Sequence, residues 1–148
     1  MRNMEDDSTI FTKIIQGEIP CHKVYEDDLI FAFLDVNPSS PGHTLVVPKE
    51  PARTLDELSD DSAQAIGRAL PRISRAVLKA TGASEFNVIQ NNGQNAFQSV
   101  FHVHFHIIPK MDDGRGVSFP FSPSSIDHED GARLSSSIRD LLSRQPSQ

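Results

Sequence analysis

Apolar positions in the first third of the chain switch between helical and strand spacing. Residues 10–16 carry apolar side chains three and four positions apart, which predicts a short helix. Residues 23–34 contain two apolar runs separated by an acidic turn, which predicts a hairpin. Residues 35–43 are a loop rich in Pro and Ser, and the β-branched run 44–47 predicts a strand that Pro48 ends.

The middle of the chain repeats apolar positions with a period near 3.6, which predicts one long helix closing at Gly82. The sequence offers two candidate positions for the N-terminus of this helix. Thr54 begins a capping-box pattern, and Ser59 or Asp60 could equally begin the main helix. Pro71 lies inside the repeat, and we expect it to kink or interrupt the helix.

The last third begins with strand-forming segments and ends in a helical pattern. Residues 86–90 predict a short strand, 91–97 a polar loop and 99–109 the longest strand. A final helix is expected near 130–144. Strands, one long helix, strands and a helical tail predict an α+β fold with an antiparallel sheet.

Composition narrows the classes of function. The chain has 148 residues, 37% of them hydrophobic, which suits one domain. Its net charge of −6 without a basic cluster argues against nucleic acid or anionic membrane as a partner. No apolar run approaches the roughly 20 residues of a membrane helix. With a single cysteine, Cys21, and no signal-peptide pattern, we expect a cytoplasmic protein.

Three of the six histidines fall within five residues, at His102, His104 and His106. Side chains alternate across a strand, so all three are expected on one face of the strand 99–109. The apolar residues between them are expected on the opposite face, in the core. The strand then has a core face and an imidazole face exposed to solvent.

Three interpretations of this face remain open. A solvated strand face could use histidine by chance, although Ser, Thr or Lys would serve equally well. A His-x-His pair could hold a Zn²⁺ ion, with a further ligand from His43 or elsewhere. Finally, a neutral imidazole whose second nitrogen donates to a fixed acceptor is a competent nucleophile.

The loop before the strand favours the nucleophile. Its neutral hydrogen-bonding side chains can bind phosphoryl oxygens without a net positive charge. They include Asn91, Gln98 and Ser99. Placed directly before three aligned imidazoles, this loop is interpreted as a binding loop.

The pattern His-x-His-x-His-x-x at residues 102–108, with apolar residues at x, resembles the signature of the histidine triad family. Segments 10–20, 33–49 and 91–110 also resemble this family in order and spacing. The resemblance covers roughly residues 8–110 and is closest to the small phosphoramidase-like nucleotide-binding branch.

This resemblance implies a five-stranded antiparallel sheet with one long and one or two short helices, extended across a homodimer. It implies purine nucleotide substrates, either nucleoside phosphoramidates or dinucleoside polyphosphates, cleaved at the α-phosphate through a nucleotidyl-histidine intermediate. The expected organisation is a mobile N-terminal tail at 1–7, a histidine triad domain at 8–110 and a C-terminal extension with a helix at 111–148. A nucleotide-binding interaction module with vestigial catalysis is the rival hypothesis.

The resemblance also assigns roles to residues. His104 is implied as the nucleophile, His102 and His106 as residues that orient it and contact phosphate, and Ser99 as a helper in protonating the leaving group. Asp35 is implied to bind the ribose, although it could simply be a turn residue. The remaining nucleotide-binding candidates are His43, Asn91 and Gln98 near the phosphate and Ile10, Phe11, Ile14, Phe33 and Val36 in a base slot, apolar positions that ordinary core packing would also explain.

The chain departs from the family pattern in two ways. Thr9 and Thr12 stand where many relatives have a zinc-binding cysteine pair, so we expect no metal and no required cofactor. Phe97 stands where many relatives have glycine just before Gln98. A Cβ there narrows the backbone approach to the phosphate and leaves the leaving-group preference open.

Overall fold

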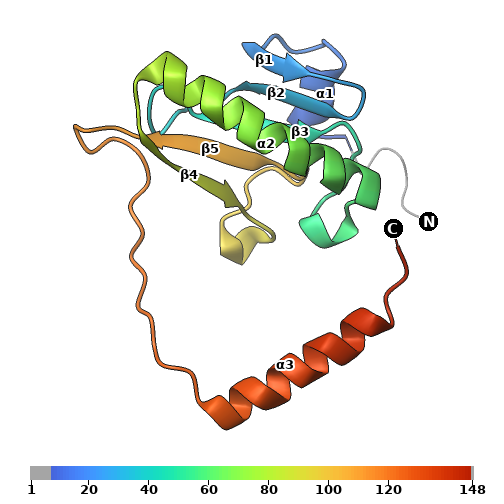
Figure 1. Cartoon of the computed structure of the whole chain (residues 1–148). Coiled ribbons are helices and arrows are strands. Elements are labelled where there is room, and N and C mark those ends of the chain that lie inside the picture. Colours follow the sequence, from blue (N-terminus) through green and yellow to red (C-terminus); the bar gives the residue numbers. More distant parts are fainter. Residues whose placement is uncertain (1–7, 148) are drawn as a thin grey trace. The chain divides into compact units, whose positions relative to one another are not determined.

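The computed structural model describes residues 8–147. The expected N-terminal tail lies outside the described residues. The chain divides into two compact units between Val117 and Ser118. The first unit holds a sheet and the long helix, and the second holds the C-terminal helix (Figure 1).

The first unit is built on one five-stranded antiparallel sheet, which confirms the predicted α+β fold. Its strands lie in the order β1-β2-β3-β5-β4, so β1 and β4 are the two edges. Their bounds are β1 Lys23–Glu26, β2 Ile30–Leu34, β3 Thr44–Pro48, β4 Glu85–Gln90 and β5 Phe105–Lys110.

The long helix α2, Asp60–Thr81, covers one face of the sheet (Figure 1). The Ser59 side chain caps it by accepting from the Ser62 amide, and Gly82 ends it in the left-handed conformation at φ 75°. Its apolar stripe packs onto alternate strand residues because successive side chains point to opposite faces. The buried cluster comprises Ile30, Ala32, Val46, Ala65, Ile66, Ala69, Ile73, Val77 and Ile107.

A short helix, α1 (Ile10–Ile15), packs against the sheet residues that do not face α2. Thr9 and Thr12 form a reciprocal capping box at its start. Phe11 and Ile14 are its buried residues. They join a second cluster with Phe31, Phe33, Leu45 and Val47 from β2 and β3. A six-residue helix covers only part of this side of the sheet.

The structure decides between the alternatives for α2, which begins after Ser59. Pro71 does not interrupt the helix, which runs unbroken from residue 60 to residue 81. Pro71 and Gly67, whose carbonyl loses its usual i+4 donor, are both exposed, so water can satisfy that carbonyl. Thr54 makes no side-chain cap and precedes a separate 3₁₀ turn, η2 (Leu55–Glu57).

The predicted strand 99–109 was also too long, because β5 begins only at Phe105. The residues before it lie against the segment that follows β3. The amide of Val103 donates to the Ala52 carbonyl at 2.9 Å, and the two side chains share a buried cluster with Leu58. Strand alternation therefore does not apply to residues 99–104.

The second unit contains α3, His128–Ser143, capped by the Asp127 carboxylate accepting from the Asp130 amide. None of its residues is buried. Ahead of α3, the rings of Phe119 and Phe121 stack at a centroid distance of 4.9 Å. Among the described residues, no helix is long and apolar enough to cross a lipid bilayer.

Candidate active site

A cavity of about 360 Å³ opens beside α1, a size typical of small-molecule sites. It collects side chains from four separate parts of the chain. All five residues predicted for the base slot line it, as do four of the polar candidates. These residues are Ile10, Phe11, Ile14, Phe33, Val36, Asp35, Ser99, His104 and His106.

His104 presents one ring nitrogen to this cavity. Its Nδ1 lies 2.7 Å from the carbonyl oxygen of His102, which fixes the proton on Nδ1 and leaves a lone pair on Nε2. The rings of Phe11 and His104 pack in a T-shaped arrangement at a centroid distance of 4.9 Å. Burial is the main cause that lowers the pKa of His104, and this keeps the ring neutral. Such a ring is a nucleophile with a fixed tautomer.

His102 is not on a solvent face and does not line the cavity, contrary to the expectation of a phosphate contact. Only 1% of it is exposed. Its Nε2 donates to the carbonyl of Pro48 at 2.7 Å, and its buried Nδ1 has no hydrogen-bond partner among residues 8–147. The ring therefore anchors this segment to the end of β3. The main-chain carbonyl of His102, rather than its imidazole, contacts His104.

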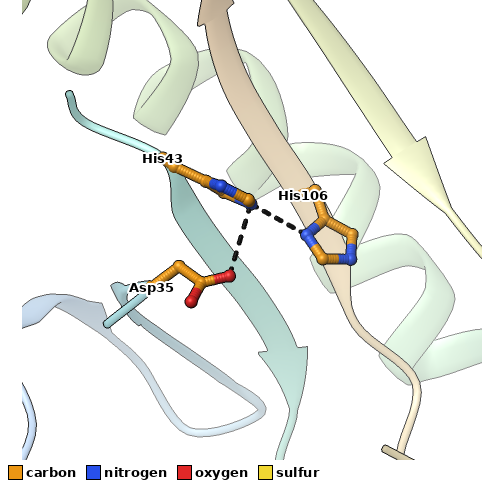
Figure 2. Close-up of side chains that lie close together, drawn as sticks. All are labelled: Asp35, His43 and His106. Atoms are coloured by element: carbon orange, nitrogen blue, oxygen red, sulfur yellow. Dashed lines mark hydrogen bonds and ion pairs between the residues drawn. The ribbon is translucent and has the colours of Figure 1, made fainter. Parts of the chain in front are cut away.

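His106 is the one triad histidine that lies within β5, directly opposite Leu45 and Ile89 of the neighbouring strands. Its Nδ1 lies 2.9 Å from Nε2 of His43 (Figure 2). The amide of Ser39 donates to Nδ1 of His43 at 3.0 Å. Neutral His43 must therefore carry its proton on Nε2 and donate it to His106. This leaves His106 with its own proton on Nε2, as a donor.

Asp35 is a turn residue that also lies in the cavity wall. Its Oδ1 accepts from the Asn37 amide at 2.8 Å, which makes it a turn residue. Its Oδ2 lies 3.5 Å from Nε2 of His43 (Figure 2). The residue also lines the cavity. The turn thus holds a carboxylate at the cavity wall, where it can accept from ligand hydroxyl groups.

A metal ion is the alternative occupant for this cluster. One ligand atom each from Asp35, His43 and His106 lie within 4.8 Å of one another. However, a metal-bound histidine normally donates its second N–H to an acceptor. His43 instead receives an amide hydrogen at Nδ1, so its Nε2 must keep a proton and cannot easily serve as a ligand. This donor set suits a directed hydrogen-bond chain better than a cation.

Thr9 and Thr12, where the resemblance implied a zinc-binding cysteine pair in relatives, do not fit a metal either. Thr9 and Thr12 accept amide hydrogens from each other and cap α1. Hydroxyl groups used in this way are poor substitutes for the thiolates that zinc prefers.

The candidates in the phosphate loop separate into two kinds. Ser99 is exposed and lines the cavity. Gln98 is buried, and its amide group bonds to three main-chain groups, of Gly93, Arg53 and Val100, so it holds the loop in place. Asn91 and Gln98 are not among the residues that line the cavity. The side-chain amide of Gln98 therefore holds the loop in position and does not point its polar atoms into the cavity.

Sequence reasoning missed the main-chain groups that set the tautomers. The Ser39 amide fixes the tautomer of His43, and the Pro48 carbonyl fixes that of His102. Main-chain groups of this kind occur in nearly every residue type, so the sequence does not mark them. It also missed Cys21 and Leu45 in the cavity wall. Leu45 could have been found, because it alternates with Val46 along β3 and must face away from α2.

Burial dominates the electrostatics of the site. It lowers the pKa of His102, His104 and His43, and it lowers the pKa of His106 to about 4 with help from the neighbouring imidazoles. All four rings are therefore neutral near pH 7. The site binds through directed N–H groups and lone pairs, with no fixed positive charge on these imidazoles.

The chain matches the HIT domain over residues 16–113. It is 50% identical over 137 residues to the adenosine 5'-monophosphoramidase hnt1 of Schizosaccharomyces pombe, covering 89% of this chain and 99% of that protein. It is 48% identical over 103 residues to the adenylylsulfatase HINT3 of Arabidopsis thaliana, covering 70% and 52%. A HIT family structure from Bacillus subtilis superposes with a TM-score of 0.85 at 40% identity, covering 94% of this chain and 98% of that one. The chain belongs to the HIT domain family.

Proposed function

We propose that this protein hydrolyses purine nucleoside 5'-phosphoramidates at the α-phosphate through covalent catalysis by His104. The observation that carries the proposal is the fixed tautomer of His104, with Nδ1–H bonded to the His102 carbonyl and a bare Nε2 at the cavity. Relatives named adenosine 5'-monophosphoramidase support the substrate class.

In the first step, the lone pair on Nε2 of His104 attacks the α-phosphorus and forms a P–N bond. The bond from phosphorus to the leaving amine breaks, and the amine takes a proton delivered through Ser99 at the cavity rim. The His102 carbonyl stabilises the positive charge that develops on the His104 ring.

In the second step, water attacks the phosphorus and gives up a proton to solvent through Ser99, which replaces the proton that the amine took. His104 leaves with its original electron pair, and the nucleoside monophosphate is released. His106 would donate its Nε2–H to a phosphoryl oxygen in both steps, because His43 occupies its Nδ1. The Asp35 carboxylate would accept from the ribose hydroxyls, and the apolar wall would hold the base.

Dinucleoside polyphosphates present the same α-phosphate and are alternative substrates. The adenylylsulfatase name of one relative shows that leaving groups differ among similar proteins. A nucleotide-binding module without turnover is the rival from another class. The bare Nε2 of His104 beside the cavity favours an enzyme.

We also propose a cytoplasmic homodimer whose sheet continues across the two subunits. Strand β4 is an edge of the sheet, and its Phe86 and Val88 side chains are 39% and 44% exposed. An apolar edge strand of this kind favours pairing with another strand.

The test of the enzymatic proposal is to trap the intermediate. Rapid quenching in alkaline denaturant, which preserves the P–N bond of a nucleotidyl-histidine, should leave the label of an adenosine phosphoramidate labelled at phosphorus on His104, which peptide mapping at alkaline pH would identify. Label on another residue, or release of product without any labelled protein, would refute covalent catalysis by His104.

A further inference from the structure

One hydrogen atom in the candidate active site has two acceptors close to it. Nε2 of His43 carries this hydrogen, because Nδ1 of the same ring accepts the Ser39 amide at 3.0 Å. Nδ1 of His106 lies 2.9 Å from this Nε2, and Oδ2 of Asp35 lies 3.5 Å from it (Figure 2). The imidazole is the nearer acceptor, but the carboxylate is the charged one, and hydrogen bonds to charged acceptors are stronger. The two acceptors therefore compete for one N–H.

Main-chain bonds hold the competing carboxylate in this position. Oδ1 of Asp35 accepts the Asn37 amide at 2.8 Å, and the Asp35 amide donates to the carbonyl of His43 at 2.9 Å. His43 is itself buried, with 4% of the residue exposed. The fold therefore fixes Oδ2 of Asp35 beside Nε2 of His43.

The two acceptors line the cavity, whereas His43 lies behind them. Asp35 and His106 are both lining residues, and His43 is not. Under the proposed function, Asp35 accepts from the ribose hydroxyls and His106 donates to a phosphoryl oxygen. The buried ring of His43 thus connects the group that contacts the sugar with the group that contacts the phosphate.

Hydroxyl groups that donate to Asp35 change the competition. They occupy lone pairs of the carboxylate and offset part of its charge, so the carboxylate attracts the His43 hydrogen less strongly. The hydrogen then points fully toward Nδ1 of His106. An imidazole that accepts at Nδ1 becomes a stronger donor at Nε2, because consecutive hydrogen bonds polarise one another in a buried site. No proton is transferred, and only the direction of one N–H changes.

We infer that His43 is a positioning residue that couples sugar recognition to phosphate activation: ribose hydroxyls bound at Asp35 direct its Nε2–H to His106, which strengthens the donor to phosphate. The inference deepens the proposed function and rests on it. Its consequence is that the ribose hydroxyls accelerate the chemical step as well as adding affinity. The site then selects ribonucleotides over deoxyribonucleotides by rate.

The experiment compares adenosine 5'-phosphoramidate with its 2',3'-dideoxy analogue in single turnovers at saturating protein. Saturation separates the chemical step from binding. In the wild type, the dideoxy compound should react about three- to tenfold more slowly, a fraction of the loss that follows removal of a whole donor. Equal rates for the two compounds, with a difference in affinity alone, would overturn the inference.

Asp35→Asn is the decisive variant, because the coupling predicts that it raises a rate. Its side-chain oxygen can still accept the Asn37 amide, which leaves an NH₂ group in place of Oδ2. This group cannot accept the His43 hydrogen, so the hydrogen should point to His106 without any ribose hydroxyl. The variant should therefore cleave the dideoxy compound about three- to tenfold faster than the wild type does. A residue that only bound ribose would give no such gain, so its absence overturns the coupling.

Asp28→Asn is the matched control, since it makes the same replacement at an exposed aspartate outside the cavity wall. It should leave both rates unchanged. His43→Ala removes the connecting ring, and adding Asp35→Asn to this variant should no longer raise the rate for the dideoxy compound. A gain of the same size in the double variant would overturn the role of His43.

Nuclear magnetic resonance of protein labelled with ¹⁵N at histidine tests the same coupling without turnover. The scalar coupling across the hydrogen bond from Nε2 of His43 to Nδ1 of His106 should be larger with saturating AMP than with 2',3'-dideoxy-AMP. In Asp35→Asn it should exceed the wild-type value before any nucleotide is added. If the wild type cleaved neither phosphoramidate, the proposed function would fail, and this measurement would still decide the inference. Equal couplings in the wild type and Asp35→Asn without nucleotide would overturn it.

Discussion

The two halves of the histidine motif are built in different ways. His106 lies in β5, opposite Leu45 and Ile89, and the strand ladder sets its direction. His102 and His104 precede the strand, and hydrogen bonds to main-chain carbonyls orient their rings. In sequence the two halves look alike, as one alternating run. The comparison shows that alternation assigns a face only where a ladder holds the backbone.

The difference assigns a separate task to each half. The irregular half supplies the lone pair of His104 and, through His102, an anchor to β3. The regular half supplies an N–H donor at His106 whose direction depends on His43. Substitutions should therefore separate into effects on chemistry, on folding stability and on binding.

The largest effect is expected at His104. His104→Ala removes the nucleophile and should lower kcat/KM by roughly 10⁴-fold or more, as loss of a covalent nucleophile does elsewhere. Binding of AMP, measured by calorimetry, should persist. His22→Ala changes an exposed histidine outside the cavity and serves as the control. Activity above a tenth of wild type in His104→Ala would contradict the assignment.

His102 should matter mainly for folding. His102→Ala leaves a buried cavity and an unpaired Pro48 carbonyl, which should cost about 3 kcal/mol in the free energy of unfolding. Urea titration measures this cost. His102→Phe keeps the volume but removes the N–H donor, so it should recover part of the loss. A stability change below about 1 kcal/mol in His102→Ala would show that the anchor is unimportant.

His106 should matter more for activity than for folding stability. His106→Ala removes one donor to phosphate and should lower kcat/KM about 10²-fold, within the range for loss of one such group. Its unfolding free energy should change by less than that of His102→Ala. If His106→Ala were the less stable of the two variants, the proposed difference between the halves would be wrong.

The smallest effect concerns pH. Burial holds the pKa values of His43, His102, His104 and His106 below 6.5. The unfolded chain therefore binds more protons below pH 6.5, so stability is complete above that pH and declines as pH falls. For His106 the decline continues to about pH 4.

Thermal melts in buffers from pH 7.5 to 4.5 would show a falling Tm. His106→Gln has no titrating ring and should flatten part of the slope. A Tm that rises as pH falls through this window would contradict neutral burial of the rings.

Local patterns were sufficient for most of the fold. The 3.6-residue period found α2 because its stripe packs on a flat sheet face, and the β-branched run found β3. Pro71 misled because its effect depends on whether the freed carbonyl reaches water, which no local pattern records. Residues 99–104 misled because a tertiary contact with the segment after β3 replaces the expected ladder.

The candidate site was likewise predictable where local patterns place side chains and unpredictable where tertiary main-chain contacts do. The structure brings Asp35, Ser99, His104 and His106 to one cavity with the five apolar candidates, although their chemical roles remain predictions. Gln98 and His102 were assigned to phosphate, but their polar groups bond to the main chain instead. The difference depends on carbonyl groups, whose positions are fixed only by the folded backbone.

The amide of Ser39 has a consequence for how such a site changes through evolution. It orients the His43 proton, and through it the His106 proton, without using any side chain of its own. Almost any residue can therefore replace serine at position 39 without reversing the direction of the hydrogen bonds that run through His43 to His106. Proline alone lacks the main-chain N–H, so it is the single replacement at this position that would directly remove the hydrogen bond that orients His43.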